Sequence, residues 1–243
     1  MKNINKTYYE NLNWDTDFFG LQTSKITRIN LNNEELSTIL IQLKNNNKKL
    51  VYYSSINKIN PCILKNFNGK LTDKKTTFNI NLDQLENINK QYYHMIKPYD
   101  KSMPTKDIEN LAIQSGEYSR FSIDKNIPRE KFIALYKIWA NKSIKKEISD
   151  EVLVIQEKTK IIGIITLGNK NGVGDIGLVA IDRDHRGKKY GEKLVRSAQS
   201  WFIQHRYKFG QVVTQGTNIP ACNLYKKCGY SIQKEEYFYH FWL

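Results

Sequence analysis

One stretch of the sequence, residues 174–195, constrains the fold more than any other. It reads GDIGLVAIDRDHRGKKYGEKLV, with an apolar strand that ends at Ile181 and an apolar face of period 3.6 that starts at Tyr190. A helix that begins directly after a basic, Gly-containing loop offers unpaired backbone N–H groups and the positive end of its dipole to an anion. The segment therefore predicts a strand, a loop and an amphipathic helix around an anion site, with a pyrophosphate as the natural occupant.

The elements around this stretch predict an α/β (α+β) chain with two domains. Helical and strand-like patterns occur together within residues 1–110: a helix is expected at 33–43, and strands are expected at 49–54 and 76–82. We expect these residues to form a smaller N-terminal α/β domain, and residues 111–243 to form the second domain. In the second domain the predicted elements are a helix at 130–143, strands at 151–156, 160–167 and 175–181, a helix from 190, a strand at 211–214, a helix at 218–227 and a terminal strand at 237–243.

Composition limits the classes of partner. The formal net charge is +14, from 38 Lys and Arg against 24 Asp and Glu, which raises a nucleic-acid hypothesis. The excess is mostly lysine and is spread along the chain, so it suits an anionic small molecule better than DNA or RNA. We expect no nucleic-acid partner, no membrane partner and no metal, because the four histidines lack ligand spacing. The polar start, three cysteines without a C-x-x-C pair and short apolar runs predict a cytoplasmic protein.

Two motifs in the second domain resemble a known superfamily. Residues 186–191, Arg-Gly-Lys-Lys-Tyr-Gly, are similar to the R/Q-x-x-G-x-G/A loop of the GNAT superfamily of N-acetyltransferases. Lys189 stands where that pattern has its first loop glycine. Residues 218–225, with Gly229 and Tyr230, are similar to its N-x-x-A-x-x-x-Y…G-[FY] signature. The resemblance covers roughly residues 115–243.

The resemblance implies a GNAT fold, with a mixed, mostly antiparallel central sheet flanked by helices. It further implies acetyl-CoA as co-substrate and direct acetyl transfer to an amine through a tetrahedral intermediate. By the same resemblance Tyr225 is the general acid for the departing thiolate. The residues implied to bind acetyl-CoA are Val179, Ala180, Ile181, Arg186, Gly187, Lys188, Lys189, Tyr190, Gly191, Asn218 and Ala221.

A narrower resemblance concerns the acceptor. Residues 12–20, LNWDTDFFG, look like the W-D-S-x-F-F-G start of the dTDP-fucosamine acetyltransferases, and residues 117–121 resemble their S-R-F segment. This implies a dTDP- or UDP-linked amino-dideoxyhexose as acceptor, in surface-polysaccharide sugar biosynthesis. Trp14 and Phe19 are expected to be core anchors of the N-terminal domain. Candidate acceptor-binding residues are Tyr118, Arg120, Phe121 and Phe18; Glu117 and Asp17 are candidate bases.

Other interpretations stay open from the sequence. The same fold could act on a protein amine or another small-molecule amine, and the basic charge keeps a nucleic-acid-binding module as a further alternative. The aromatic run at residues 237–242 is either core or the interface of a homodimer.

Overall fold

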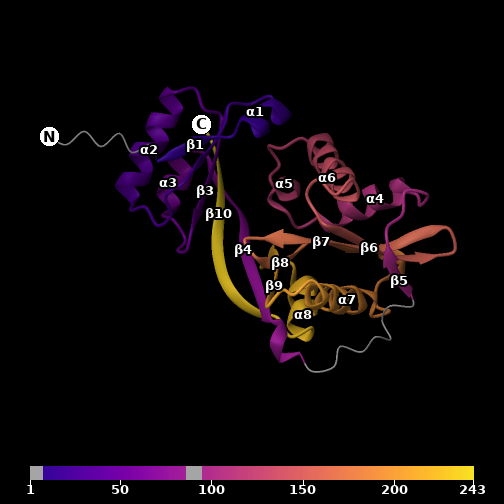
Figure 1. Ribbon diagram of the computed structural model, residues 1–243. Coiled ribbons are helices and arrows are strands. Elements are labelled where there is room, and N and C mark those ends of the chain that lie inside the picture. The colour runs from indigo at the N-terminus through magenta and orange to yellow at the C-terminus, as the bar shows by residue number, and fades with distance from the viewer. Residues whose placement is uncertain (1–7, 86–94) are drawn as a thin grey trace. The chain divides into compact units, whose positions relative to one another are not determined.

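The computed structural model describes residues 8–85 and 95–243, and their contacts divide the chain into two units. One unit comprises Met1–Lys75 together with Glu235–Leu243, and the other comprises Thr76–Lys234. Two long strands, β4 (Gly69–Asn81) and β10 (Ser231–Trp242), run from one unit into the other (Figure 1). The domain boundary expected near residue 110 falls inside the second unit.

The first unit pairs its strands in the order β1–β2–β3–β10. The pairs β1–β2 and β3–β10 are antiparallel, and β2–β3 is parallel. A capping box, in which Asn32 and Glu35 exchange side-chain and backbone hydrogen bonds, starts α2. Strand β3 and helix α2 confirm the strand and helix expected at 49–54 and 33–43. The remaining bounds are β1 (Tyr9–Asn11), α1 (Asn13–Phe19), β2 (Thr23–Ile26), α2 (Asn33–Asn45), β3 (Leu50–Ser55) and α3 (Pro61–Asn66).

Helix α1 corrects one expectation. Trp14 and Phe19 were expected in the core, but Trp14 is 46% exposed and α1, which includes Phe19, contains no buried residue. The polar side of the helix holds it in place: the Thr23 N–H donates to the Thr16 hydroxyl at 3.0 Å, and the buried Tyr52 hydroxyl donates to Asp15 at 3.2 Å. Because these polar contacts anchor α1, the indole of Trp14 stays at the surface.

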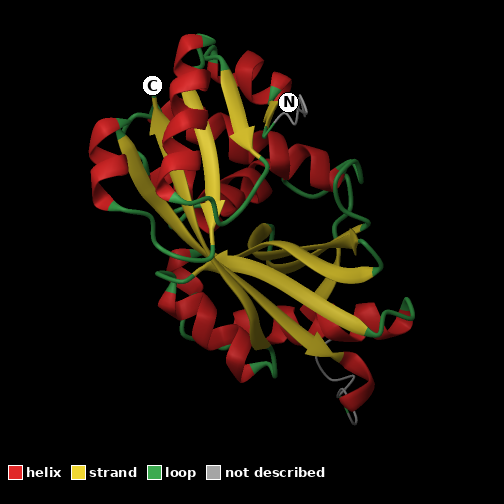
Figure 2. Ribbon diagram, turned by 90° about the vertical axis from the view of Figure 1, so that its left-hand side faces the viewer, coloured by secondary structure: helices red, strands yellow, loops and turns green. Residues whose placement is uncertain are grey.

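The second unit contains a mixed, mostly antiparallel sheet with helices on both faces, as expected for the fold (Figure 2). Its strand order is β4–β9–β8–β7–β6–β5; every pair from β5 to β8 is antiparallel, and β8–β9 is parallel. The strands are β5 (Ile96–Pro98), β6 (Glu151–Glu157), β7 (Lys160–Lys170), β8 (Val173–Ile181) and β9 (Phe209–Gln215). The helices are α4 (Thr105–Ser115), α5 (Arg120–Ile123), α6 (Arg129–Ile144), α7 (Tyr190–Gln204) and α8 (Ile219–Lys227), with single 3-10 turns η1 (Leu82–Gln84) and η3 (Arg183–His185).

Alternation of side chains along β6 gives this unit two cores. Leu153 and Ile155 point into a core shared with α7, whereas Val152 and Val154 point into a core shared with α4 and α6. Helix α7 therefore covers one face of the sheet and α4 and α6 cover the other (Figure 1). All six strands and helices expected between residues 151 and 227 are confirmed, with ends shifted by a few residues.

A β-bulge interrupts β8 near its middle. Ile165 pairs with Val179 and Leu167 pairs with Ile176, so Gly177 and Leu178 lie opposite a single β7 residue. The Leu178 N–H donates to the Thr166 hydroxyl at 2.8 Å, which satisfies a backbone group that the bulge takes out of the ladder. A Cβ on residue 177 would lie only 2.7 Å from that hydroxyl oxygen, so the bulge requires glycine there.

Candidate active site

The two parallel strands of the second unit pair at their start and not at their end. Gly174, Asp175 and Ile176 of β8 pair with Gly210, Gln211 and Val212 of β9. Beyond Ile176 the described residues of β8 and β9 form no further pairs, although β8 stays paired with β7 up to Ile181. One edge of the last residues of β8 therefore presents backbone N–H and C=O groups that are not paired with a neighbouring strand.

A cavity of about 450 Å³ lies at this open edge. Four parts of the second unit form its walls: the end of β8, the loop before α7 with the first turn of that helix, helix α8, and the end of α4 with the segment that follows it. The lining is Gln114, Ser115, Glu117, Tyr118, Val179, Ala180, Ile181, His185, Arg186, Gly187, Lys189, Tyr190, Gly191, Glu192, Asn218, Pro220, Ala221, Leu224, Tyr225 and Lys227.

The loop before α7 has the backbone of a glycine-rich turn even where it lacks glycine. Gly187 has φ +83°, and Lys189, the N-cap of α7, is left-handed with φ +60° and ψ +14°. A non-glycine residue in this region costs roughly 1–2 kcal/mol. The Lys189 side chain makes no capping hydrogen bond, so it leaves the first N–H groups of α7 open to a ligand. The departure from the family pattern at this position thus preserves the backbone that a glycine would adopt.

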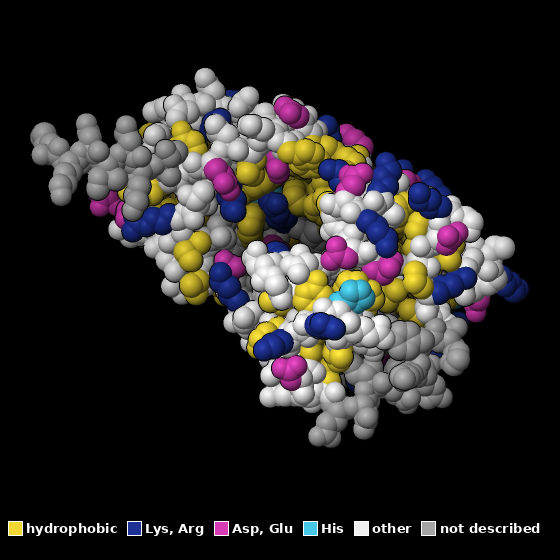
Figure 3. All heavy atoms as spheres, viewed as in Figure 1, with side chains coloured by type: hydrophobic (Ala, Val, Ile, Leu, Met, Phe, Trp, Pro, Cys, Tyr) yellow, Lys and Arg dark blue, Asp and Glu magenta, His cyan; other side chains and the backbone are white. Residues whose placement is uncertain are grey.

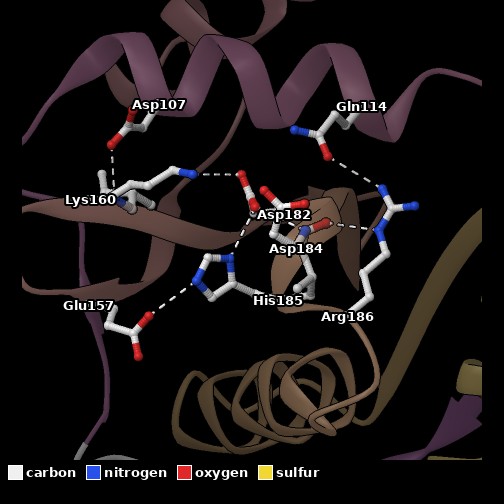
Figure 4. Close-up of polar contacts among 10 residues, drawn as sticks. Asp107, Gln114, Glu157, Lys160, Asp182, Asp184, His185 and Arg186 are labelled. Carbon is white, nitrogen blue, oxygen red and sulfur yellow. Dashed lines mark hydrogen bonds and ion pairs between the residues drawn. The ribbon is translucent and has the colours of Figure 1, made fainter.

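Polar contacts fix this loop to the turn between β6 and β7 (Figure 4). Asp182 accepts from the Asp184 N–H at 3.2 Å and from Lys160 Nζ at 3.1 Å, and His185 Nδ1 lies 3.0 Å from the same carboxylate. His185 Nε2 lies 3.1 Å from the carboxylate of Glu157. The hydrogen bond with His185, and then that with Lys160, hold the pKa of the Asp182 carboxyl below its ordinary value.

Two arginines fix the same loop to the other side of the cavity. Arg183 forms an ion pair with Glu117. Arg186 donates from Nε to the Ile181 carbonyl at 3.1 Å and from Nη2 to Gln114 Oε1 at 3.4 Å (Figure 4). The guanidinium of Arg186, expected to contribute charge to an anion site, is thus engaged with protein oxygens.

Tyr225 is the buried phenol of the site. Its side chain is only 5% exposed, and its ring packs against Phe78 at 5.7 Å and Tyr230 at 6.2 Å between centroids. Burial, with a smaller contribution from Cys222 and Cys228, raises the pKa of the Tyr225 hydroxyl far above its ordinary value. The phenol is therefore protonated throughout the neutral range, and it can donate a hydrogen bond or its proton to a developing anion.

Helix α8 is positioned by contacts at both of its ends. The Asn218 side chain accepts from the Ala221 N–H at 3.2 Å and so caps the N-terminus of the helix. At the other end, Lys227 lies 2.7 Å from Glu192 in the first turn of α7, and Arg196 lies 3.2 Å from the same carboxylate. Both pairs lower the pKa of Glu192. The ion pair joins α7 and α8 across the cavity wall.

The structure brings most of the expected site residues to one cavity. The residues expected to bind acetyl-CoA all line it except Lys188, and so do Tyr225 and Tyr118. Arg120 and Phe121 lie outside the lining: Phe121 is buried against Trp139, and the Arg120 guanidinium lies 4.1 Å from the centroid of the Phe121 ring. Phe18 lies on α1 in the first unit, stacked on Trp14 at 4.9 Å.

Sequence reasoning missed several lining residues, notably His185, Glu192 and Lys227. A helix-favouring acid in the first turn of α7 was a readable signal for Glu192. Its pairing with Lys227 depends on how α7 and α8 pack, which no local pattern carries. Within residues 8–85 and 95–243, no cluster of three or more His, Cys, Asp or Glu side chains has a metal-binding arrangement. No helix in the same ranges has the length and apolar character to cross a membrane.

Comparisons with known proteins agree with this geometry. Residues 114–230 match the acetyltransferase (GNAT) family, whose members use acetyl-CoA. Streptothricin acetyltransferase of Escherichia coli is 32% identical over 74 residues, which are 30% of this chain and 42% of that protein. The spore coat polysaccharide biosynthesis protein SpsD of Bacillus subtilis (strain 168) is 21% identical over 155 residues, 59% of this chain and 53% of that protein. The chain thus spans about half the length of these curated relatives.

A solved structure gives the same fold. The GCN5-related N-acetyltransferase of Sphaerobacter thermophilus superposes with a TM-score of 0.59 at 13% identity, covering 96% of this chain and 75% of that one. The family match, the open edge of β8 and the loop before α7 all fall in the same part of the chain. Residues 114–230, a little under half of the chain, are therefore similar to the acetyltransferase (GNAT) family, and the second unit has the fold of that family.

Proposed function

We propose that the protein is an N-acetyltransferase that transfers the acetyl group of acetyl-CoA to the amine of a dTDP- or UDP-linked amino-dideoxyhexose, for surface-polysaccharide synthesis. One observation carries the acetyl-CoA half: the open edge of β8, the uncapped start of α7 and the buried Tyr225 border a single cavity. Two observations support the acceptor half. Residues 12–20 resemble the start of dTDP-fucosamine acetyltransferases, and a relative is named for spore coat polysaccharide biosynthesis.

The elongated acetyl-CoA molecule fits the two ends of this cavity. The pyrophosphate is received by the N–H groups of Tyr190 and Gly191 at the start of α7, with the Lys189 charge beside them. The amide groups of the pantetheine arm pair with the open edge of β8 from Val179 to Ile181, as an added strand would. The proposed donor site therefore uses backbone groups for position and lysine for charge.

The reaction needs a neutral amine, a partner for the developing oxyanion and a proton for the departing sulfur. The amine nitrogen attacks the thioester carbonyl carbon, the tetrahedral intermediate collapses, and the C–S bond breaks. The amine nitrogen loses one proton to water and the sulfur gains one. Tyr225 supplies the hydrogen bond to the developing thiolate and, late in the step, its proton.

The pKa difference sets how late that proton moves. A phenol with an ordinary pKa near 10 is a poorer acid than a thiol with a pKa near 8.5, by roughly 1.5 pKa units or about 2 kcal/mol. Burial raises the pKa of Tyr225 and so increases this difference. Tyr225 thus stabilises the thiolate first by hydrogen bonding, and full proton transfer follows bond cleavage. Glu117 lines the cavity and is the candidate base there, whereas the other candidate, Asp17, lies on α1 in the first unit.

A second acceptor class has one observation in its favour. The relative with 32% identity is named as a streptothricin acetyltransferase, which keeps a non-nucleotide amine as an alternative acceptor. The nucleic-acid alternative receives no comparable support. On the face viewed in Figure 3, lysine and arginine side chains are scattered among acidic ones instead of forming one continuous basic patch.

The test is thiol release from acetyl-CoA by the purified protein with dTDP- and UDP-linked 3-amino and 4-amino dideoxyhexoses and with streptothricin. We expect turnover with a nucleotide-linked amine and its loss in Tyr225→Phe. Turnover with streptothricin alone would overturn the acceptor half of the proposal. No release with any amine, and no thermal stabilisation by acetyl-CoA, would overturn the whole proposal.

A further inference from the structure

Arg186 lines the proposed acetyl-CoA cavity, and two nitrogens of its guanidinium donate to protein oxygens. Its Nε donates to the Ile181 carbonyl at 3.1 Å, and its Nη2 donates to Gln114 Oε1 at 3.4 Å (Figure 4). Both acceptors belong to residues that line the same cavity. A single side chain thus connects the end of β8, the loop before α7 and the end of α4.

This placement matters because the end of β8 has lost its β9 partner. Ile181 is the last residue of β8, and pairing with β9 stops at Ile176. A strand end held by one neighbour alone frays more readily than one held on both sides. The Nε donor of Arg186 supplies a fixed partner for the Ile181 carbonyl where β9 does not.

We propose that Arg186 is a positioning residue for acetyl-CoA and not a ligand of its phosphates. It fixes the Ile181 carbonyl and the Gln114 side chain so that the pantetheine arm meets an ordered strand edge. The phosphates are met by the N–H groups of α7 and by Lys189, whose side chain makes no capping bond to the helix. This inference rests on the proposed acetyl-CoA site.

Side-chain geometry makes the proposal distinguishable from a charge role. In glutamine the amide nitrogen is attached to Cδ, as Nε is in arginine, so Gln at 186 can still donate to the Ile181 carbonyl but carries no charge. In lysine the ammonium lies one bond further along, so Lys keeps the charge but not a donor at the Nε position. The motif that residues 186–191 resemble accepts either Arg or Gln at its first position. These two side chains share a nitrogen donor attached to Cδ, but they do not share a charge.

The first experiment compares two acetyl donors, acetyl-CoA and acetyl-pantetheine, which lacks the phosphates, in Arg186→Gln, Arg186→Lys and Arg186→Met. We expect Arg186→Lys and Arg186→Met to raise KM about tenfold for both acetyl donors, because each variant loses the hydrogen bond from the charged Nε to the Ile181 carbonyl. We expect KM of Arg186→Gln to stay within about threefold of the wild-type value. Arg206→Gln, which removes an exposed arginine outside the cavity lining, is the matched control for general loss of charge.

The opposite order would overturn the proposal. If Arg186 binds phosphate, Arg186→Gln raises KM for acetyl-CoA, Arg186→Lys is tolerated, and acetyl-pantetheine is insensitive to every variant. A salt dependence of KM that weakens in Arg186→Gln would point to the same conclusion.

A second measurement needs no turnover and separates this inference from the proposed function. Amide hydrogen exchange of the ligand-free protein should speed up for residues 180–187 in Arg186→Lys and Arg186→Met, and not in Arg186→Gln. If acetyl-CoA fails to bind wild type, the proposed function is overturned while this exchange pattern still tests the contact with Ile181. Unchanged exchange in all three variants would overturn the positioning role.

Discussion

Ile176 of β8 and Val212 of β9 form the last pair between these two parallel strands, and the cavity opens directly beyond them. The bulge at Gly177 and Leu178 follows immediately on β8. A bend at that position increases local twist and turns the strand away from its neighbour. The bulge that separates β8 from β9, and so leaves room for a ligand, therefore lies directly after the last pair between the two strands.

Replacing Tyr225 with phenylalanine should remove chemistry and spare donor binding. We expect kcat to fall by about 100-fold or more, the range typical of a general acid, while acetyl-CoA still binds with near wild-type affinity. Steady-state kinetics and calorimetric titration measure the two quantities. Tyr230→Phe is the matched control, because Tyr230 is an equally buried phenol outside the cavity lining. Equal loss of kcat in both variants would remove the special role assigned to Tyr225.

The left-handed backbone at Lys189 predicts an unusual order of stability. Lys189→Gly and Lys189→Ala both remove the charge, but only glycine adopts φ +60° without a side-chain clash. Urea unfolding should therefore show Lys189→Gly more stable than Lys189→Ala by about 1 kcal/mol. Both variants should bind acetyl-CoA more weakly than wild type and with less salt dependence, to the same extent. Retained affinity in both would exclude the Lys189 ammonium from phosphate binding.

The lowered pKa of Asp182 predicts a stability difference that depends on pH. Because the folded state holds this carboxyl below its ordinary pKa near 3.9, its ionised form stabilises the fold above that value, and the contribution is lost as pH falls through the folded pKa. Asp182→Asn should be less stable than wild type at neutral pH by about 1 kcal/mol or less, since the contacts are partly solvated.

The pH titration of unfolding checks this prediction. The difference between wild type and Asp182→Asn should shrink between roughly pH 5 and pH 2. Asp184→Asn is the control, because residue 184 contributes its backbone N–H to the cluster. A difference that is constant across this range would show that the Asp182 charge adds nothing to the loop.

Glycine at 177 should be required for both folding and activity. A Cβ there would lie 2.7 Å from Thr166 Oγ1, the acceptor that satisfies the Leu178 N–H, so Gly177→Ala should destabilise the protein by about 1–3 kcal/mol. It should also raise KM for acetyl-CoA, because the bulge sets the course of the open strand edge. Gly168→Ala on β7 serves as control: its Cβ would meet the nearest atom at 3.6 Å, an ordinary contact. Equal tolerance of both alanines would contradict the role of the bulge.

The sequence predicts the second unit well because its signals are local. The apolar period of α7 and the apolar runs of β6, β7 and β8 are each decided within a few residues, and the structure confirms these elements. The orientation of α1 depends instead on Tyr52 and Thr23, which approach only after folding, so the burial of Trp14 was predicted wrongly. The hydrogen bond from Arg186 to Gln114 was missed for the same reason. The sequence shows that residue 186 is charged, but it does not show which atom accepts the hydrogen bond.

The most direct test of the account is amide hydrogen exchange of the wild-type protein with and without saturating acetyl-CoA. We predict slower exchange in two segments, residues 178–181 at the open edge of β8 and residues 187–192 at the start of α7, with little change in β6 and β7. Protection that falls elsewhere, or no protection at concentrations that saturate binding, would contradict the assignment of this cavity to acetyl-CoA.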